Sequence, residues 1–429
     1  MQEVVIVSGA RTAVGTFGGS LKDVGVVELG KTVIREAVVR AGLRPVPGEN
    51  AGKEAPDRLQ DAPATDLEKN AGVWDESAVP VAIDEVIMGN VLIAAQGQNP
   101  ARQAMIHAGI CKETPAFTIN KVCASGLKAI ALGAASIMME DAEIIIAGGQ
   151  ESMSNAPMAL PKARWGHRME VTGKGEVLDL MVYDGLYEIF YGYHMGVTAE
   201  NIVEKYGISR QQQDELSVLS HNRAMAAIKN GTFAQEIVPV TIKTRKGDVV
   251  IDTDERPMET DMDKMAKLKP VFKKDGTVTA GNASGINDGA AAVVLMSAKK
   301  AKALGLTPLA KISAFAAGGV DPAYMGLGPI PAIRKVLKKT GRSIGDMDVI
   351  ELNEAFAAQA LACIKDLNIP MEKPNQLGSG ISLGHPIGCT GARQAVSAIY
   401  QMKNTGASTA LISMCIGGGM GMAMILESA

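Results

Sequence analysis

Cys123 is the first of three side chains whose type and surroundings could support covalent chemistry. It lies within residues 119–127, directly before a strongly helical stretch. The unpaired N–H groups and the positive dipole end of a helix N-terminus favour the thiolate, the form of cysteine that attacks carbonyl carbons. Free cysteines are also often buried and inert, so a packing role is the alternative interpretation.

His385 is the second candidate, because it lies between Gly384 and Pro386 in a turn-like sequence. A histidine in that setting does not fill the core face of a helix. Its imidazole is the side chain best matched to accepting a proton from a thiol near neutral pH. A purely structural turn histidine is the alternative.

Cys415 is the third candidate, since it ends an apolar run and precedes the glycine-rich residues 417–421. Glycines let backbone N–H groups approach a ligand closely, as an oxyanion hole requires. A glycine-rich turn beside a packed cysteine would give the same pattern. The run does not fit a dinucleotide-binding fingerprint, because the strand-like residues 422–426 follow it instead of a helix.

Two other kinds of site are not supported by the sequence. Residues 25–32 match the phosphate-loop pattern GxxxxGK[ST], but they lie within an amphipathic helical run and no strand directly precedes them. We interpret this match as chance. The histidines have neither HxxxH nor HExxH spacing, so we predict no metal site; they are His107, His167, His194, His221 and His385.

Composition and charge narrow the class of protein. The 429 residues have a formal net charge of −3, which offers no basic surface for nucleic acid. The five cysteines lie far apart without CxxC spacing, which favours a reducing compartment over a disulfide framework. No secretory signal is recognisable, and the apolar residues 411–426 are interrupted by glycines. We therefore expect a cytoplasmic protein that binds neither nucleic acid nor membrane.

The two halves of the chain repeat one order of elements. Residues 84–90 and 348–353 each read as a strand that begins with Asp and ends with Asn. Each is followed by a loop with a candidate reactive residue, a helix, a second strand and glycines. The expected helices are 124–140 and 391–402, and the expected second strands are 143–147 and 409–414. Strands that alternate with helices indicate two stacked βαβ-type halves.

Two segments interrupt this order. Residues 44–80 contain five prolines, many charges and almost no periodicity, which indicates a surface insertion. Residues 156–280 are rich in methionine, tyrosine and charged residues and read as a long insertion carried by the first half. Trp74 is either a docking anchor or the start of the next packed element, and we favour packing.

Seven motifs, taken in order, resemble those of the thiolase family. They are NKVCASGLKA, GGQESMSNAP, YHMG, AGNASGINDGAA, NEAFA, GHPIG and CIGGGMG, and the resemblance covers nearly the whole chain apart from residues 44–80. A ketoacyl synthase, the nearest rival of the same fold, would use a cysteine with two histidines, and Cys415 stands in place of the second histidine. A coenzyme A-binding protein without catalysis is the alternative from another class, and a nucleotide-hydrolysing protein would depend on residues 25–32.

The resemblance implies a role for each candidate. Cys123 would be the nucleophile that takes an acyl group from coenzyme A, and His385 would activate it. His385 would also face one oxyanion hole, where Asn353 holds a water. Cys415 would be the acid/base at the carbon next to the thioester. The backbone N–H groups of Cys123 and Gly417 would form the second oxyanion hole.

The resemblance also implies a pocket for pantetheine and the acyl group. Its lining would be Leu186, His194, Met195, Phe272, Ala280, Ser284, Met325, Ala355 and Phe356. The YHMG motif is associated with short-chain members of the family that act on acetoacetyl-CoA. Coenzyme A would be substrate and product, with no permanently bound cofactor. The implied reaction is the reversible condensation of two acetyl-CoA to acetoacetyl-CoA, and a 3-ketoacyl-CoA thiolase of broader chain length in fatty-acid β-oxidation is the alternative.

The implied fold is α/β and five-layered, αβαβα, with two mixed five-stranded sheets from an internal duplication and a loop domain. The implied parts are an N-terminal half (1–155 and 281–307, with the 44–80 insertion), a loop domain (156–280) and a C-terminal half (308–429). Family members form dimers and tetramers, so we expect a homo-oligomer. Leu377 departs from the second asparagine of many relatives, so we expect different hydrogen bonding around His385.

Overall fold

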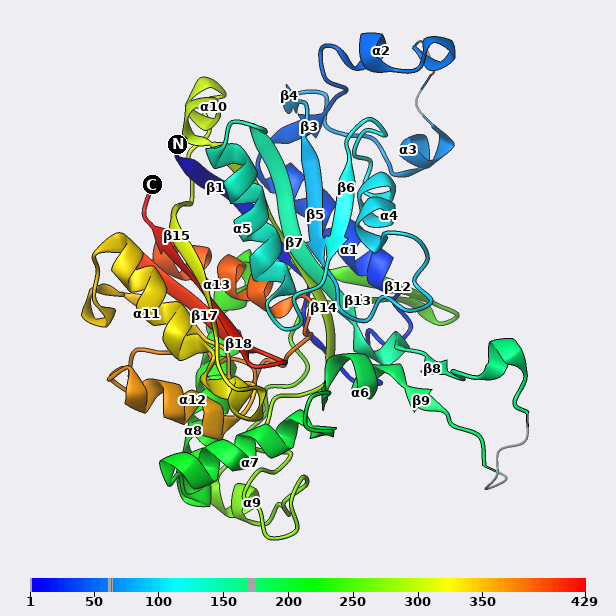
Figure 1. Cartoon of the computed structure of the whole chain (residues 1–429). Coiled ribbons are helices and arrows are strands. Elements are labelled where there is room, and N and C mark those ends of the chain that lie inside the picture. The colour runs from blue at the N-terminus through cyan, green and yellow to red at the C-terminus, as the bar shows by residue number, and fades with distance from the viewer. Residues whose placement is uncertain (1, 61–62, 64, 169–173) are drawn as a thin grey trace.

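One mixed β-sheet of ten strands forms the centre of the molecule (Figure 1). The computed structural model describes residues 2–60, 63, 65–168 and 174–429. The strand order is β16-β17-β18-β15-β1-β14-β7-β5-β6, with β2 paired to β14. The bounds are β1 Val4–Arg11, β2 Gly15–Thr16, β5 Glu85–Gly89, β6 Ala116–Ile119, β7 Ile144–Ser152, β14 Asn287–Ser297, β15 Ala310–Gly319, β16 Val349–Leu352, β17 Thr409–Ile416 and β18 Met420–Glu427.

The two halves of the sheet meet at a narrow junction between β1 and β15. Their register consists of the pairs Val5–Lys311 and Ile6–Ala310, after which β15 pairs with β18 alone. The hydrogen-bonded sheet is therefore continuous, and its C-terminal side contributes four strands, β15 to β18. This differs from the expected two separate sheets of five strands, because the first residues of β1 and β15 run side by side.

Six helices cover the sheet in three groups. Helices α1 (Val26–Arg40) and α4 (Pro100–His107) share a buried apolar cluster with β1, β5, β7 and β14. Helices α11 (Pro329–Thr340) and α12 (Ala357–Asp366) share another with β15 to β18. Helices α5 (Ser125–Met138) and α13 (Thr390–Thr405) share a third cluster with strands from both halves. The α5–α13 pair therefore lies between the two halves of the sheet.

Close approach of α5 and α13 depends on glycine. A Cβ atom on Gly126 would lie 2.9 Å from the backbone nitrogen of Ala392. A Cβ atom on Gly391 would lie 2.6 Å from the backbone nitrogen of Leu127. Contacts this short are sterically forbidden for any larger residue, so the N-terminal ends of the two helices meet backbone to backbone.

The expected internal repeat is confirmed at the level of hydrogen bonds. The Asp84 carboxylate accepts the N–H groups of Glu143 and Ile144 at 2.7 and 2.8 Å. The Asp348 carboxylate accepts those of Ser408 and Thr409 at 2.8 and 3.1 Å. Each aspartate thereby joins the first strand of its half to the parallel second strand.

The register of the two first strands shows which of their residues are equivalent. Glu85 pairs with Ile145, and Val349 pairs with Ala410, so Gly89 is equivalent to Asn353. Asn90 is then equivalent to Glu354, although both strand segments end with Asn in the sequence.

The remaining elements are short or peripheral. Helices α7 Met195–Tyr206 and α8 Arg210–Lys229 are the long ones among them, with α2 Ala51–Glu54, α3 Asp66–Asn70, α6 Leu180–Gly185, α9 Met262–Ala266 and α10 Ala298–Ala303. Two-stranded sheets pair β3 Leu43–Pro45 with β4 Val79–Val81, β8 Met158–Ala159 with β9 Leu178–Asp179, β10 Tyr187–Glu188 with β11 Tyr193–His194, and β12 Val240–Thr244 with β13 Gly247–Ile251. In the part of the chain described, no helix is long and apolar enough to cross a membrane.

The chance phosphate-loop match begins at Gly25, the N-cap of α1, and its other residues lie in that helix. Gly30 is a packing glycine, since a Cβ atom there would lie 1.7 Å from Oε1 of Gln150. Lys31 pairs with Glu28 one turn earlier on the same helix. The match is therefore not a phosphate loop.

The 44–80 insertion lies at the periphery with two short helices, α2 and α3 (Figure 1). Trp74 packs against the body of the protein: its ring lies under the Arg35 guanidinium at 4.2 Å, and its Nε1–H donates to the Gly109 carbonyl at 3.0 Å. These contacts support the packing interpretation over a docking anchor.

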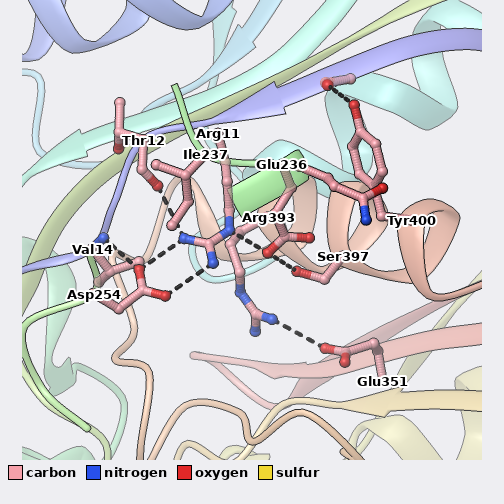
Figure 2. Close-up of polar contacts among 12 residues, drawn as sticks. Arg11, Thr12, Val14, Glu236, Ile237, Asp254, Glu351, Arg393, Ser397 and Tyr400 are labelled. Carbon is pink, nitrogen blue, oxygen red and sulfur yellow. Dashed lines mark hydrogen bonds and ion pairs between the residues drawn. The ribbon is translucent and has the colours of Figure 1, made fainter. Parts of the chain in front are cut away.

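Buried ion pairs connect the 156–280 segment to the central sheet (Figure 2). Arg11, at the end of β1, donates from Nη1 and Nη2 to Asp254 at 2.7 and 2.9 Å and from Nε to Glu236 at 2.6 Å. Glu236 also accepts from Ser397 of α13 at 3.1 Å. Removing one partner of such a buried pair would leave an uncompensated charge, so this contact fixes the position of residues 254–256 beside the site described below.

Candidate active site

The three reactive candidates lie around one cavity of about 520 Å³ between the two halves. Cys123 comes from the turn before α5, His385 from the loop before α13, and Cys415 from the end of β17. Gly417, in the turn between β17 and β18, completes the inner wall. Cys123 and His385 are far apart in the sequence, and they lie close together because the N-terminal ends of α5 and α13 pack against each other.

All nine residues expected to line the pocket do so: Leu186, His194, Met195, Phe272, Ala280, Ser284, Met325, Ala355 and Phe356. The Phe272 ring is central to this wall. It stacks on His194 at 4.7 Å between ring centroids and meets Phe356 edge-on at 6.2 Å. A Cβ atom on Gly196 would lie 2.2 Å from the Phe272 ring, which is a physical reason for glycine in the YHMG motif.

The turn that presents Cys123 is strained. Val122 has φ of 47°, a left-handed conformation that β-branched residues rarely adopt. The Asn120 side chain accepts the Val122 N–H at 2.8 Å, and the Ser125 hydroxyl donates to the Val122 carbonyl at 2.6 Å. Two side chains thus hold an unfavourable backbone conformation directly before the nucleophile candidate, a pattern concentrated at functional sites.

The Cys123 side chain is half-buried at the wall of the cavity. Burial raises the pKa of its thiol to about 11, and hydrogen bonds from the Gly417 N–H and its own N–H group act in the opposite direction. Loss of solvent is the larger effect and favours the thiol, whereas the helix N-terminus favours the thiolate. The thiol needs a base.

His385 is held in the tautomer that a base requires. Its Nδ1 lies 2.6 Å from the Thr390 hydroxyl, whose single proton is donated to the Pro386 carbonyl at 2.9 Å. Nδ1 must therefore carry a proton and donate it, which leaves Nε2 as the acceptor. Burial and the nearby Arg393 lower the pKa of His385 to about 3, so the free protein holds a neutral imidazole.

Asn353 is not among the residues that line the cavity, but its side chain contacts His385. Its Nδ2 lies 3.4 Å from His385 Nε2. Its Oδ1 is buried and has no hydrogen-bond partner among the described residues. The Asn353 Nδ2 group thus lies beside the imidazole nitrogen that was expected to face an oxyanion hole.

Cys415 is fully buried, and burial holds its pKa well above the usual range, with the neighbouring Cys123 thiol acting in the same direction. It is therefore a thiol in the free protein and can donate a proton before it accepts one. Among the described residues, no group of three or more His, Cys, Asp or Glu side chains is placed to hold a metal ion.

Arg256 also lines the cavity and was not predicted from the sequence. Its Nε donates to the Ile381 carbonyl at 2.7 Å and its Nη2 to the Ala283 carbonyl at 3.1 Å. Burial lowers its pKa without a compensating carboxylate. No local pattern flags this residue, because it lies in irregular sequence that Asp254 and Glu255 anchor to the start of the chain. Thr16, Phe17, Met153 and Thr279 were missed in the same way.

The chain that forms this cavity, with a cysteine after a strained turn, a neutral histidine and a second thiol, has a family match over nearly its whole length. The model of the thiolase N-terminal domain matches residues 4–49 and 50–299, and that of the thiolase C-terminal domain matches residues 306–428. The chain belongs to the thiolase family. The finer division into two halves and a loop domain with the expected boundaries stays a prediction.

The relatives found by sequence are of the same length. The chain is 52% identical over 429 residues to an acetyl-CoA acetyltransferase of Syntrophomonas wolfei, covering 100% of this chain and 99% of that protein. It is 50% identical to an acetyl-CoA acetyltransferase of Cupriavidus necator, covering 100% of both. The crystal structure of the Bacillus anthracis acetyl-CoA acetyltransferase matches with a TM-score of 0.89 at 44% identity, covering 100% of this chain and 99% of that one.

The protonation state of the site predicts how Cys123 responds to pH. A pKa of about 11 means that the thiolate fraction, and so the rate of alkylation by iodoacetamide, rises continuously between pH 6 and pH 10. Mass spectrometry of the Cys123 peptide measures this rate directly. A rate that is already constant below pH 7 would contradict the neutral pair, because it would require a preformed thiolate–imidazolium pair.

Proposed function

We propose that this protein is an acetyl-CoA acetyltransferase, which condenses two acetyl-CoA to acetoacetyl-CoA and coenzyme A and catalyses the reverse thiolysis. The observation that carries the proposal is that Cys123, His385 and Cys415 line one cavity. The full-length relatives that bear this name support the choice of acyl group.

The first half-reaction transfers acetyl to the enzyme. His385 Nε2 accepts the Cys123 proton as the sulfur attacks the thioester carbon. The oxygen that becomes negative faces the N–H groups of Cys123 and Gly417, and removing one such donor typically costs about 2.7–4 kcal/mol of barrier. The Sγ–C bond forms, the bond to coenzyme A breaks, and the leaving thiolate takes the Cys415 proton. One thioester replaces another, so this step costs little overall.

The second half-reaction forms the carbon–carbon bond. The Cys415 thiolate removes a proton from the methyl carbon of a second acetyl-CoA, whose enolate oxygen faces His385 and a water that Asn353 would hold. The carbanion attacks the acetyl group on Cys123. The released Cys123 thiolate takes back the proton held by His385, and both cysteines are thiols again. This closed proton balance agrees with a Cys415 pKa well above the usual range.

The proposal includes how coenzyme A is held. Pantetheine would run along the wall that contains Ser284, Phe272 and His194. The positive charge of Arg256, with no compensating carboxylate to shift its pKa upward, favours an anionic substrate at this wall. Coenzyme A is then substrate and product, and no permanently bound cofactor is part of the proposal.

The proposal extends to assembly and architecture. We infer a homo-oligomer, a dimer or tetramer, because β6 is an edge strand of the central sheet. The position of α5 and α13 between the halves supports the five-layered αβαβα description. A cytoplasmic location stays a prediction from the sequence.

Substitution of the two cysteines separates their roles. In Cys123→Ala, both acylation by labelled acetyl-CoA and turnover are lost, because no nucleophile remains. In Cys415→Ala, the enzyme still acylates slowly, since His385 and Cys123 are intact, but forms no acetoacetyl-CoA. Mass spectrometry of the intact protein follows the acetyl group. Acetyl on Cys415 in the Cys123→Ala protein would overturn the assignment.

Chain length distinguishes the proposal from a thiolase of broader specificity. The wall formed by His194, Met195, Met325 and Phe356 supports a short acyl group. Acetoacetyl-CoA should therefore be cleaved much faster than a 3-ketoacyl-CoA of about eight or more carbons, measured as kcat/KM for thiolysis. Faster cleavage of the long substrate would favour the alternative thiolase instead.

A further inference from the structure

Two buried glutamates form hydrogen bonds with the loop that carries His385, and neither has a role in the mechanism proposed above. The loop, residues 375–390, lies between α12 and the first residue of α13 and contains His385. Glu151, at the end of β7, and Glu354, just after β16, are 0% and 1% exposed. Buried carboxylates are costly to desolvate, so their presence beside a catalytic loop calls for an explanation.

Glu151 uses its full capacity as an acceptor. Its Oε1 accepts from Asn90 Nδ2 at 2.7 Å and from Leu92 N–H at 3.1 Å. Its Oε2 accepts from Val91 N–H at 3.0 Å and from Gly388 N–H at 2.8 Å. Every partner is an N–H donor, so only a carboxylate satisfies all four at once.

The donors of Glu151 come from both halves of the site. Gly388 lies three residues after His385 in the C-terminal half. Val91 and Leu92 belong to the N-terminal half and share an apolar cluster with Ile387 and Cys123. Glu151 therefore links the loop of the base to the packing around the nucleophile.

Glycine at position 388 is explained by this contact. A Cβ atom there would lie 2.6 Å from Oε2 of Glu151 and 3.0 Å from the carbonyl oxygen of Gln150. The backbone of the loop thus approaches the carboxylate as closely as glycine allows, and a larger residue would push the loop away.

Glu354 holds the earlier part of the same loop. Its Oε1 accepts from Asn375 Nδ2 at 2.8 Å, and its Oε2 accepts from the Ser220 hydroxyl at 2.6 Å. The Ile381 N–H group also donates to this carboxylate. The contacts fall at residues 375 and 381 on one side of His385, whereas Glu151 contacts residue 388 on the other.

We propose that Glu151 and Glu354 are positioning residues that clamp the His385 loop from both sides and so set the distance between His385 Nε2 and the Cys123 sulfur. Proton transfer from a thiol requires heavy-atom contact within hydrogen-bond reach. A displacement of about 1 Å at such a site can lower the rate roughly 100-fold. This inference rests on the proposed function, because its test measures the rate of thiolysis.

The test uses the full-length proteins Glu151→Gln and Glu354→Gln. Glutamine keeps the shape but turns one acceptor oxygen into an N–H donor. At Glu151 this donor faces only N–H groups, and at Glu354 it faces either the Asn375 amide or the Ser220 hydroxyl. We expect kcat for thiolysis to fall by roughly 10- to 100-fold, with KM for coenzyme A unchanged, because the cavity wall that binds pantetheine is not displaced. Iodoacetamide alkylation of Cys123 should slow in parallel.

Asp84→Asn is the matched control. Asp84 is also a carboxylate that accepts two strand N–H groups, at 2.7 and 2.8 Å, but it lies at the opposite end of β5 from the site. Its substitution should lower the melting temperature and leave kcat unchanged. Equal losses of kcat in Asp84→Asn and in both glutamine variants would overturn the proposal, because they would reflect general destabilisation.

Glu151→Asp separates position from charge. Aspartate keeps the negative charge but withdraws the carboxylate by about 1.5 Å, beyond reach of the Gly388 N–H. We expect its kcat to fall as in Glu151→Gln, and wild-type kcat would overturn a positioning role for Glu151. If Glu151 variants do not fold, Glu354→Gln decides the matter alone by the same split of kcat from KM. Absence of thiolysis in the wild-type protein would instead contradict the proposed function.

Discussion

The meeting of α5 with α13 is the constraint on which the site depends. Each helix begins directly after a loop with a reactive side chain, Cys123 in one half and His385 in the other. The two helix starts can touch only because Gly126 and Gly391 have no Cβ atom. The two similar halves thus form one site between them, in which the N-terminal half presents Cys123 and the C-terminal half presents His385 and Cys415.

Burial then decides the charge state of that site. A helix N-terminus and two N–H groups favour the Cys123 thiolate, but loss of solvent has the larger effect and the thiol stays protonated. The same burial keeps His385 neutral with Nε2 free. Because the thiol and the histidine are both neutral, the apolar cavity contains no separated charges before the reaction. Charge develops only during the reaction, when the surrounding donors can stabilise it on a thioester oxygen.

Much of this could be predicted from the sequence. The order of strands and helices in both halves and the reactive loops followed from the sequence, and the nine pocket residues were implied by the resemblance to the thiolase family, which the family match confirms. The sequence does not show that Asn90 and Asn353 occupy different positions in the repeat, because register depends on which carbonyl an N–H group meets. Arg256 was missed because its role comes from contacts across the chain and leaves no local pattern. Glu151 lies within the GGQESMSNAP motif, but its role depends on a contact with Gly388 that the motif does not reveal.

A cross-link between the two sulfurs tests the central claim most directly. Treatment with 1,3-dibromoacetone, whose two reactive carbons flank one carbonyl, should join Cys123 to Cys415 within one molecule. Peptide mass spectrometry would then find the two peptides connected by a single acetone bridge, and prior acetylation of Cys123 should prevent it. Separate modification of the two cysteines, or a bridge from either one to Cys363 or Cys389 instead, would show that the thiols do not face a common substrate.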